Sequence, residues 1–391
     1  MHLSSVIHQY QDLLAEDVQV YFSPGRVNLI GEHIDYLGGR VFPTAISLGI
    51  YAIVSAREDH TFLFQSHNFP SVEPIKISTD ELQYTQSRGW ANYPIGMIDA
   101  FVRHGLTLGH GLNVIVYGNL PNGAGLSSSA SLEVLMGIVL EDQYQYPMDR
   151  IELVQIAKHV ENEYVGVNCG IMDQFAVGMS KYNHAIYLDT NTLEYDLVPL
   201  QLKHHSIVIA NSNVKRGLVD SKYNERRQEC DAGLAIVQQR YPAIKHLCDA
   251  TIDQASAARV DMTPTIWKRV RHAITEQRRT IAAVEALREN DIQTFGAILN
   301  AGHQSIRDDF EVSCHELDVL QESFVYHGAL GARMTGAGFG GCVIAIVPNE
   351  ELDSIQHLVQ QDYLNHTNYH VDFYICETSD GARRLTKEEW E

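Results

Sequence analysis

Apolar residues in the first half of the chain follow two periods, one typical of helices and one typical of strands. Helical spacing predicts helices over residues 3–16 and 92–104, and Gly105 would end the second of them. Short runs rich in β-branched and aromatic residues predict strands at 18–22, 50–56, 61–66 and 112–117. Ser23-Pro24-Gly25 follows the first of these runs and indicates a turn.

The second half of the chain is mostly helical by the same criterion. Further helices are expected at 131–140, at 150–164 and from Gly217 to about Tyr326, strands at 185–188 and 206–211, and a strand, helix and strand over 330–376. Because strands give way to helices near residue 200, we expect two domains, 1–200 and 201–391. Within the helical part, Trp267 to Arg288 is rich in basic residues and is interpreted as a solvated helix face.

Residues 120–134, LPNGAGLSSSASLEV, join a predicted strand to a predicted helix. The two glycines allow backbone angles that are closed to other residues, and the small side chains let an anion approach the amide groups of the loop. The free N–H groups of the first helical turn would face the same point. The sequence therefore favours a phosphate-binding loop, with a glycine turn and a serine N-cap as the structural alternative.

Two other stretches stand out from the core pattern. Residues 26–39, RVNLIGEHIDYLGG, crowd Glu32, His33 and Asp35 between apolar neighbours, which is typical of a binding or capping segment. Residues 336–341, GAGFGG, satisfy the GxGxxG dinucleotide pattern, but they precede a predicted strand where that pattern requires a helix. A glycine-rich hairpin is therefore favoured, and an NAD-dependent oxidoreductase is disfavoured. The P-loop pattern GxxxxGK[ST] does not occur.

Composition narrows the possible partners. Forty-nine acidic and 29 basic residues give a formal charge of −20, which disfavours nucleic acid and anionic membranes as partners. Six cysteines without a CxxC pair predict neither a disulfide framework nor a zinc site. The first sixteen residues lack the pattern of a secretory leader, and no apolar run approaches the ~18 residues of a membrane span, so we expect a cytoplasmic protein. The oligomeric state stays open, and a monomer is compatible with the sequence.

Taken together, three stretches carry a family resemblance. PGRVNLIGEHIDYLGG, PNGAGLSSSAS and ARMTGAGFGGC, in this order and spacing, resemble the three motifs of the GHMP small-molecule kinases, and of galactokinases in particular. The resemblance implies a two-lobed α+β fold with ATP and a sugar in the cleft between the lobes. It also implies ATP-dependent phosphorylation of the anomeric hydroxyl of galactose, giving galactose 1-phosphate and ADP.

The resemblance assigns residues to the nucleotide side of the site. The residues that would wrap the phosphates of ATP are Gly123, Ala124, Gly125, Leu126, Ser127, Ser128 and Ser129. Ser129 and Glu161 would bind Mg²⁺, and Ser66 would lie near the nucleotide. Without the resemblance, Glu161 would be interpreted as an exposed glutamate late in a helix.

The sugar side is assigned in the same way. The residues that would contact the sugar are Glu32, His33, Asp35, Gly170, Asp173 and Tyr223. Asp173 would also be the catalytic carboxylate, and Arg26 its partner, which would keep it ionised. Whether Asp173 removes the proton of the anomeric hydroxyl or only orients that hydroxyl stays open.

One departure from the family pattern bears on the substrate. Galactokinases usually read EHTDYNGG, whereas this chain reads EHIDYLGG, with Ile34 and Leu37 in place of threonine and asparagine. The loss of two polar groups could widen or relax the sugar pocket, unless both side chains face the core. Galactose is the expected substrate, with N-acetylgalactosamine or another hexose as the alternative. A sugar sensor without turnover is the alternative from another functional class.

Overall fold

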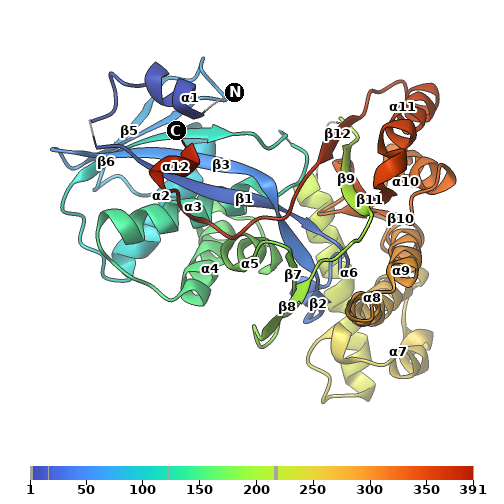
Figure 1. Ribbon diagram of the computed structural model, residues 1–391. Coiled ribbons are helices and arrows are strands. Elements are labelled where there is room, and N and C mark those ends of the chain that lie inside the picture. Colours follow the sequence, from blue (N-terminus) through green and yellow to red (C-terminus); the bar gives the residue numbers. More distant parts are fainter. Residues whose placement is uncertain (1–2, 16, 122, 215–218, 391) are drawn as a thin grey trace.

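The computed structural model describes residues 3–15, 17–121, 123–214 and 219–390 (Figure 1). A six-stranded sheet lies on one side of the molecule, with the strand order β13-β1-β3-β6-β4-β5. Its strands are β1 Gln19–Asn28, β3 Pro43–Arg57, β4 Thr61–Ser66, β5 Ile75–Ser78, β6 Gly111–Gly118 and β13 Arg383–Arg384. All neighbours are antiparallel except β4 and β6. The strands predicted at 50–56, 61–66 and 112–117 are confirmed as β3, β4 and β6.

One face of this sheet is covered by helices that follow one another in sequence (Figure 1). They are α2 Asn92–Arg103, α3 Ser128–Gln143, α4 Arg150–His159 and α5 Met172–Met179. The helices predicted at 92–104, 131–140 and 150–164 are confirmed, and the last turn of the third is the π-helical segment Val160–Val165. Helix α5 was not predicted. It is two turns long, too short for a clear helical period.

Two predictions near the N-terminus are wrong. Ser23-Pro24-Gly25 is no turn but part of β1, which shifts register against β3 between Pro24 and Arg26. Proline is tolerated there because β13 pairs with β1 only at Tyr21 and Phe22, which leaves that edge of Pro24 without a ladder. The helix expected over 3–16 ends early, as α1 Leu3–Gln9. Asp12 follows it, where a negative charge is unfavourable to a helix C-terminus. Glu16 lies outside the described residues.

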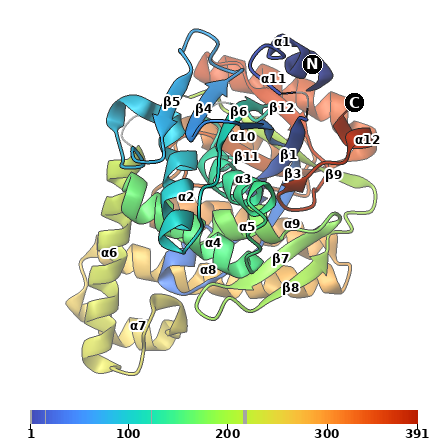
Figure 2. The same ribbon diagram turned by 90° about the vertical axis from the view of Figure 1, so that its left-hand side faces the viewer.

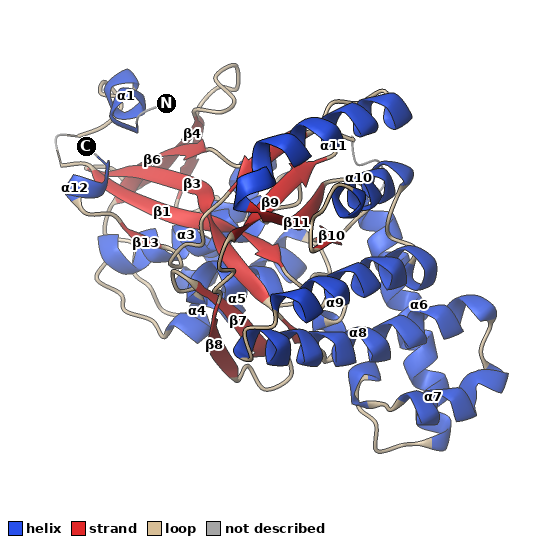
Figure 3. Ribbon diagram, turned by 45° about the vertical axis from the view of Figure 1, so that its right-hand side comes forward, coloured by secondary structure: helices blue, strands red, loops and turns tan. Residues whose placement is uncertain are grey.

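A second sheet lies on the other side of the molecule, in the order β10-β11-β9-β12 (Figure 3). Its strands are β9 His205–Asn211, β10 Gly331–Thr335, β11 Cys342–Pro348 and β12 Asp372–Ile375. Helices α9 Ile292–Ser305, α10 His315–Tyr326 and α11 Leu352–Thr367 pack against it. The strand, helix and strand expected over 330–376 are confirmed, and residues 336–341 form the β10–β11 hairpin, as predicted.

The remaining elements surround these two sheets. A small sheet of β2 Arg40–Val41, β7 His184–Asp189 and β8 Tyr195–Pro199 includes the β7–β8 hairpin visible in Figure 2. The long helices α6 Val219–Arg240 and α8 Pro264–Arg288 flank the short α7 Ile252–Ala258, and α12 Lys387–Trp390 closes the described chain. The predicted helical stretch is thus confirmed from Val219 onward, while Gly217 lies outside the described residues. The boundary near residue 200 stays a prediction.

Candidate active site

Two adjoining cavities lie where the three sequence motifs come together. The larger, about 320 Å³, is lined by Glu32, His33 and other polar groups. The smaller, about 280 Å³, is lined by residues of the loop 123–129. Arg26, Asp173 and Ala337 line both cavities. Stretches that lie as far apart in the chain as Arg26 and Ala337 therefore meet at one place, with Arg26 and Asp173 at the junction.

Arg26 and Asp173 form a bidentate ion pair. Nε and Nη2 of Arg26 donate to the two carboxylate oxygens of Asp173 at 2.8 and 2.7 Å. Nη1 of Arg26 donates to the carbonyl oxygen of Gly125 at 2.8 Å, and the Ser127 hydroxyl donates to Oδ2 of Asp173. Arg26 is 3% exposed, so its planar guanidinium fixes both the carboxylate and the loop in one orientation.

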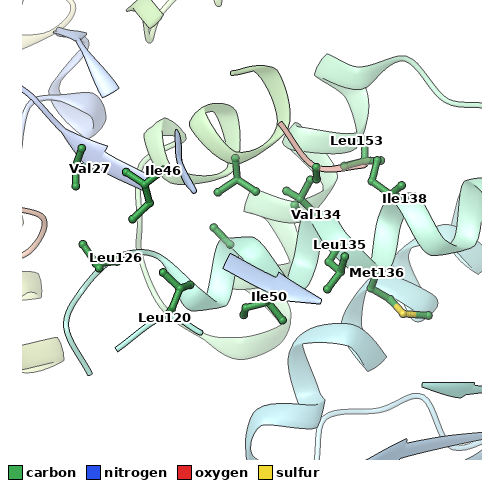
Figure 4. Packing of buried hydrophobic residues seen from close by; sticks show 14 of the residues in the cluster. Val27, Ile46, Ile50, Leu120, Leu126, Val134, Leu135, Met136, Ile138 and Leu153 are labelled. Carbon is green, nitrogen blue, oxygen red and sulfur yellow. The ribbon is translucent and has the colours of Figure 1, made fainter. Parts of the chain in front are cut away.

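The loop that precedes α3 is anchored to the core by apolar side chains. Ala124 and Leu126 are buried, and Leu120 before them belongs to the same hydrophobic cluster. Figure 4 shows Leu120 and Leu126 in this cluster together with Val27 of β1 and Ile46 of β3. Burial of each large side chain contributes roughly 1.5–3 kcal/mol, so the loop has a fixed position although its cavity side is glycine and serine.

The residues between these anchors turn the backbone toward the smaller cavity. Gly123, Gly125 and Ser127 have φ values of +70°, +75° and +65°. Glycine adopts this conformation without cost, whereas for Ser127 it is strained, as is frequent at ligand sites. Helix α3 begins at Ser128, and the Ser127 side chain makes no cap hydrogen bond to it. The first-turn N–H groups of α3 are thus not capped by that hydroxyl, which pairs with Asp173 instead.

Glu161 lines the larger cavity and is buried, not exposed. It sits in the π-helical turn Val160–Val165, a rare conformation often found at functional sites. The Nε2 atom of Gln174 donates to its carboxylate at 2.5 Å. Burial raises the pKa of Glu161, and a hydrogen bond from Ser129 acts in the opposite direction. The two predicted magnesium ligands therefore lie in contact, although they are thirty-two positions apart.

Glu32 lines the larger cavity from the loop after β1, and two hydrogen-bond donors and one cation hold its carboxylate. Its Oε1 accepts from the backbone N–H of Gly336 at 2.8 Å, and its Oε2 accepts from Nδ2 of Asn28 at 2.7 Å. Nη2 of Arg333 lies 3.0 Å from Oε2. Burial raises the pKa of Glu32 to about 7, against the opposing effect of Arg333. The two hydrogen bonds and the positive charge of Arg333 each favour the ionised form.

His33 is held in a single tautomer by its two neighbours. Its Nε2 lies 3.1 Å from the carbonyl oxygen of Ala337, which can only accept, so Nε2 carries the proton. Its Nδ1 then accepts from the Tyr36 hydroxyl at 2.9 Å. Burial lowers the pKa of His33 to about 3, so the ring is neutral. With φ at +60°, His33 is also a strained non-glycine residue in the site.

Asp35 completes the polar wall. Burial raises its pKa to about 6, and the nearby negative charge of Asp173 acts in the same direction. Gly170 is required beside it, because a Cβ there would lie 1.8 Å from Oδ2 of Asp35. Tyr223 of α6 also lines the cavity, with its ring 5.2 Å from that of His33 between centroids. The structure thus brings all the predicted sugar-contact residues together.

Three residues singled out from the sequence lie elsewhere. Ile34 and Leu37 are buried in the hydrophobic cluster below the site, and neither is among the described residues that line the larger cavity. The expectation that they could widen the pocket is therefore wrong, and the core alternative is correct. Ser66 is buried at the end of β4, beside Val116 of β6, and it does not line either of these two cavities.

The interpretation of Trp267–Arg288 as a solvated face is wrong for one side of α8. Arg269, His272 and Glu276 are buried, and their spacing places them on one stripe of the helix. Nε2 of His272 lies 3.1 Å from the backbone oxygen of Glu32, and Oε1 of Glu276 accepts from the N–H of Gly31 at 3.0 Å. Sequence reasoning missed this stripe because a charged residue is usually on the surface.

No cluster of three or more His, Cys, Asp or Glu residues suited to a metal ion occurs among the described residues, at this site or elsewhere. In the same residues, no helix is long and apolar enough to cross a bilayer.

Comparison with known proteins identifies the family of the chain. Residues 8–56 match the galactokinase galactose-binding signature, residues 92–181 the GHMP kinases N terminal domain and residues 283–364 the GHMP kinases C terminal domain. A galactokinase of Clostridium beijerinckii is 46% identical over 380 residues, covering 96% of this chain and 97% of that protein. One of Enterococcus faecalis is 48% identical, covering 93% and 95%. The chain belongs to the galactokinase family of GHMP kinases.

Solved structures place this galactokinase family member in the same fold. A crystal structure of Lactococcus lactis galactokinase complexed with galactose is 41% identical, covers 98% of this chain and all of its own, and superposes with a TM-score of 0.95. Mevalonate kinase of Methanococcus jannaschii, at 17% identity, 93% and 99% coverage and a TM-score of 0.69, shares the fold alone. The expected α+β GHMP kinase fold is confirmed.

Proposed function

We propose that this protein transfers the γ-phosphoryl group of ATP to the anomeric hydroxyl of galactose, giving galactose 1-phosphate and ADP. The observation that carries the proposal is the position of the Arg26–Asp173 pair, which lines both the polar cavity and the cavity of the glycine-serine loop. Phosphoryl transfer needs an acceptor hydroxyl held in line with the phosphate, and these two cavities adjoin at that pair. The galactose complex of the Lactococcus lactis relative supports the choice of sugar.

The larger cavity suits a sugar because its wall is built from fixed hydrogen-bonding groups. Glu32 and Asp35 would accept from sugar hydroxyls, and Tyr223 would cover the ring with an aromatic face. Both carboxylates are held by backbone N–H groups, from Gly336 and Met172. Such prearranged acceptors read the configuration of hydroxyls strongly, because a wrong epimer would leave a buried polar group unpaired.

The smaller cavity suits the phosphates of ATP. Gly123 has open space where a Cβ would stand, so its backbone is accessible to a ligand. The first turn of α3 lines the same space, where its free N–H groups would bind an anion. Residues 123–129 as a phosphate loop are part of our proposal, and Ser66 stays a prediction for the nucleotide.

The donor set also fits Mg²⁺. Ser129 and Glu161 offer one hydroxyl and one carboxylate in contact, and Mg²⁺ is usually bound by one or two protein oxygens plus phosphates and water. The ion would supply positive charge to the transferring phosphoryl group. Ser129 and Glu161 are accordingly proposed as its ligands.

Catalysis would centre on Asp173. Arg26 donates to both of its carboxylate oxygens, and Ser127 adds a third donor, so the carboxylate is fixed in direction. It is the acceptor for the anomeric O–H, which it orients and from which it would receive the proton as the new O–P bond forms and the bond to ADP breaks. Arg26 would stabilise negative charge next to the phosphoryl group.

A coupled assay of ADP release over a panel of sugars tests the proposal. We expect kcat/KM to be highest for galactose, and phosphorus NMR to show the new phosphate on C1. A higher kcat/KM for N-acetylgalactosamine than for galactose would identify N-acetylgalactosamine as the substrate instead. Sugar binding without ADP release would instead identify a sensor and reject the enzyme.

A further inference from the structure

A buried ionic pair lies behind Glu32 and does not line the cavity in the described residues. Arg333 of β10 and Glu276 of α8 are both 0% exposed. Nη2 of Arg333 lies 2.9 Å from Oε1 of Glu276 and 3.0 Å from Oε2 of Glu32. One guanidinium nitrogen therefore bridges two carboxylates, one of which faces the sugar cavity and one of which does not.

The contacts of Glu32 leave little freedom for its carboxylate. A carboxylate has about four acceptor positions on its two oxygens. Gly336 occupies one and Asn28 a second, while Nη2 of Arg333 lies against Oε2 as an ion-pair partner without a hydrogen bond. About two positions then remain for a ligand, and their direction depends on the two donors and on the guanidinium that hold the carboxylate.

Glu276 holds both the backbone of residues 31 and 32 and the guanidinium of Arg333. Its Oε1 accepts from the backbone N–H groups of Gly31 and Glu32 at 3.0 and 3.3 Å, in addition to facing Arg333. Its Oε2 accepts from Nε of Arg279 at 2.8 Å. The cluster therefore holds two carboxylates and two guanidinium groups, of which only that of Arg279 is partly exposed.

Stability alone is a poor reason for such a cluster. Taking charges out of water costs several kcal/mol each, and well-packed apolar side chains of the same volume are often as stabilising. The cluster lies instead directly behind a carboxylate of the site. Its members come from α8, from β10 and from the loop after β1, so it also links the parts of the chain that form the sugar wall.

We propose that Arg333 and Glu276 are positioning residues for sugar recognition, which hold the Glu32 carboxylate so that it accepts from one particular sugar hydroxyl. The inference rests on the proposed sugar kinase activity. Arg333 acts through the side chain of Glu32, and Glu276 acts through Arg333 and the backbone of residues 31 and 32.

Arg333→Lys and Glu276→Gln test this with galactose and its four monodeoxy analogues at C2, C3, C4 and C6. Each variant should raise the galactose KM about tenfold, with kcat reduced less than threefold and the ATP KM unchanged, because only a ground-state hydrogen bond is misdirected. One analogue lacks the hydroxyl that Glu32 accepts from. With that analogue as substrate, the variants and the wild type should have the same kcat/KM. Glu32→Gln should identify that same analogue.

Arg269→Lys is the matched control. Arg269 of α8 is buried like Arg333, but it pairs with Glu229 and Glu311 and not with Glu32. It should lower thermal stability without changing the ranking of the analogues. An equal penalty on galactose and all four analogues, or a parallel rise in the ATP KM, would overturn the inference. If Arg333→Lys does not fold, Glu276→Gln and the shift of the melting temperature by each sugar decide the question. Failure of the wild type to release ADP with any sugar would reject the proposed function instead.

Discussion

The phosphate side and the sugar side of the site are built from different kinds of chemical groups. The phosphate side is mainly one continuous stretch, residues 123–129, whose glycines and serines line the smaller cavity. The sugar side is assembled from side chains of segments far apart in the chain, such as Glu32 and Tyr223, and from a buried charged cluster behind them. A phosphate needs donors and little shape, whereas a sugar must be told from its epimers, which requires fixed side chains.

Asp173→Ala removes the group that joins the two sides and should have the largest effect. We expect kcat to fall by about 10³-fold or more, because both the proton acceptor and the partner of buried Arg26 are lost. Sugar binding, measured by calorimetry, should persist. Asp196→Ala, which removes an exposed carboxylate paired with Arg288, is the control and should be neutral. A variant of Asp173 that keeps most of its turnover would remove Asp173 from the mechanism.

Gly170→Ala should impair the use of the sugar and leave nucleotide binding unchanged. The added Cβ would lie 1.8 Å from the Asp35 carboxylate, so Asp35 or the chain at Gly170 must move. A displacement of this size costs about 10²-fold in kcat/KM for galactose. The ATP KM should change little. Gly109→Ala, with open space where its Cβ would stand, serves as the neutral control. Parallel losses for ATP and galactose would show that the two sides are not separable in this way.

Ser129→Ala should weaken the binding of Mg²⁺ and nucleotide and leave sugar binding unchanged. Loss of one of two protein ligands should raise the Mg²⁺ concentration for half-maximal rate about tenfold, and should weaken Mg²⁺-dependent nucleotide binding in calorimetry by a similar factor. Ser131→Ala removes a hydroxyl two positions later, which donates to the Ser23 carbonyl at 2.9 Å, and should leave the Mg²⁺ requirement unchanged. An unchanged Mg²⁺ requirement in Ser129→Ala would assign the ion to other groups.

The same contrast explains what could be predicted from the sequence. The loop 120–134 is local, so its strand, turn and helix start follow from glycine and serine chemistry within fifteen residues. The hairpin at 336–341 was likewise predictable from the strand that follows it. Glu276 and Arg333 were not, because a buried ion pair between a helix and a strand has no local signal and its members resemble surface residues. Glu161 needed the family resemblance for the same reason.

Ile34→Thr and Leu37→Asn should have the smallest effect on sugar choice. Both side chains pack in the core. Ile34 lies so close to Gly39 that a Cβ added to Gly39 would be 2.7 Å from Cδ1 of Ile34. Restoring the usual family residues should therefore lower stability by about 1–3 kcal/mol through unpaired buried polar groups, while the ratio of kcat/KM for galactose over N-acetylgalactosamine changes less than threefold. Chemical denaturation and the ADP-release assay measure the two quantities. A large change in that ratio without loss of stability would show that the core beneath the loop also shapes the pocket, and would extend the sugar side beyond the residues that line it.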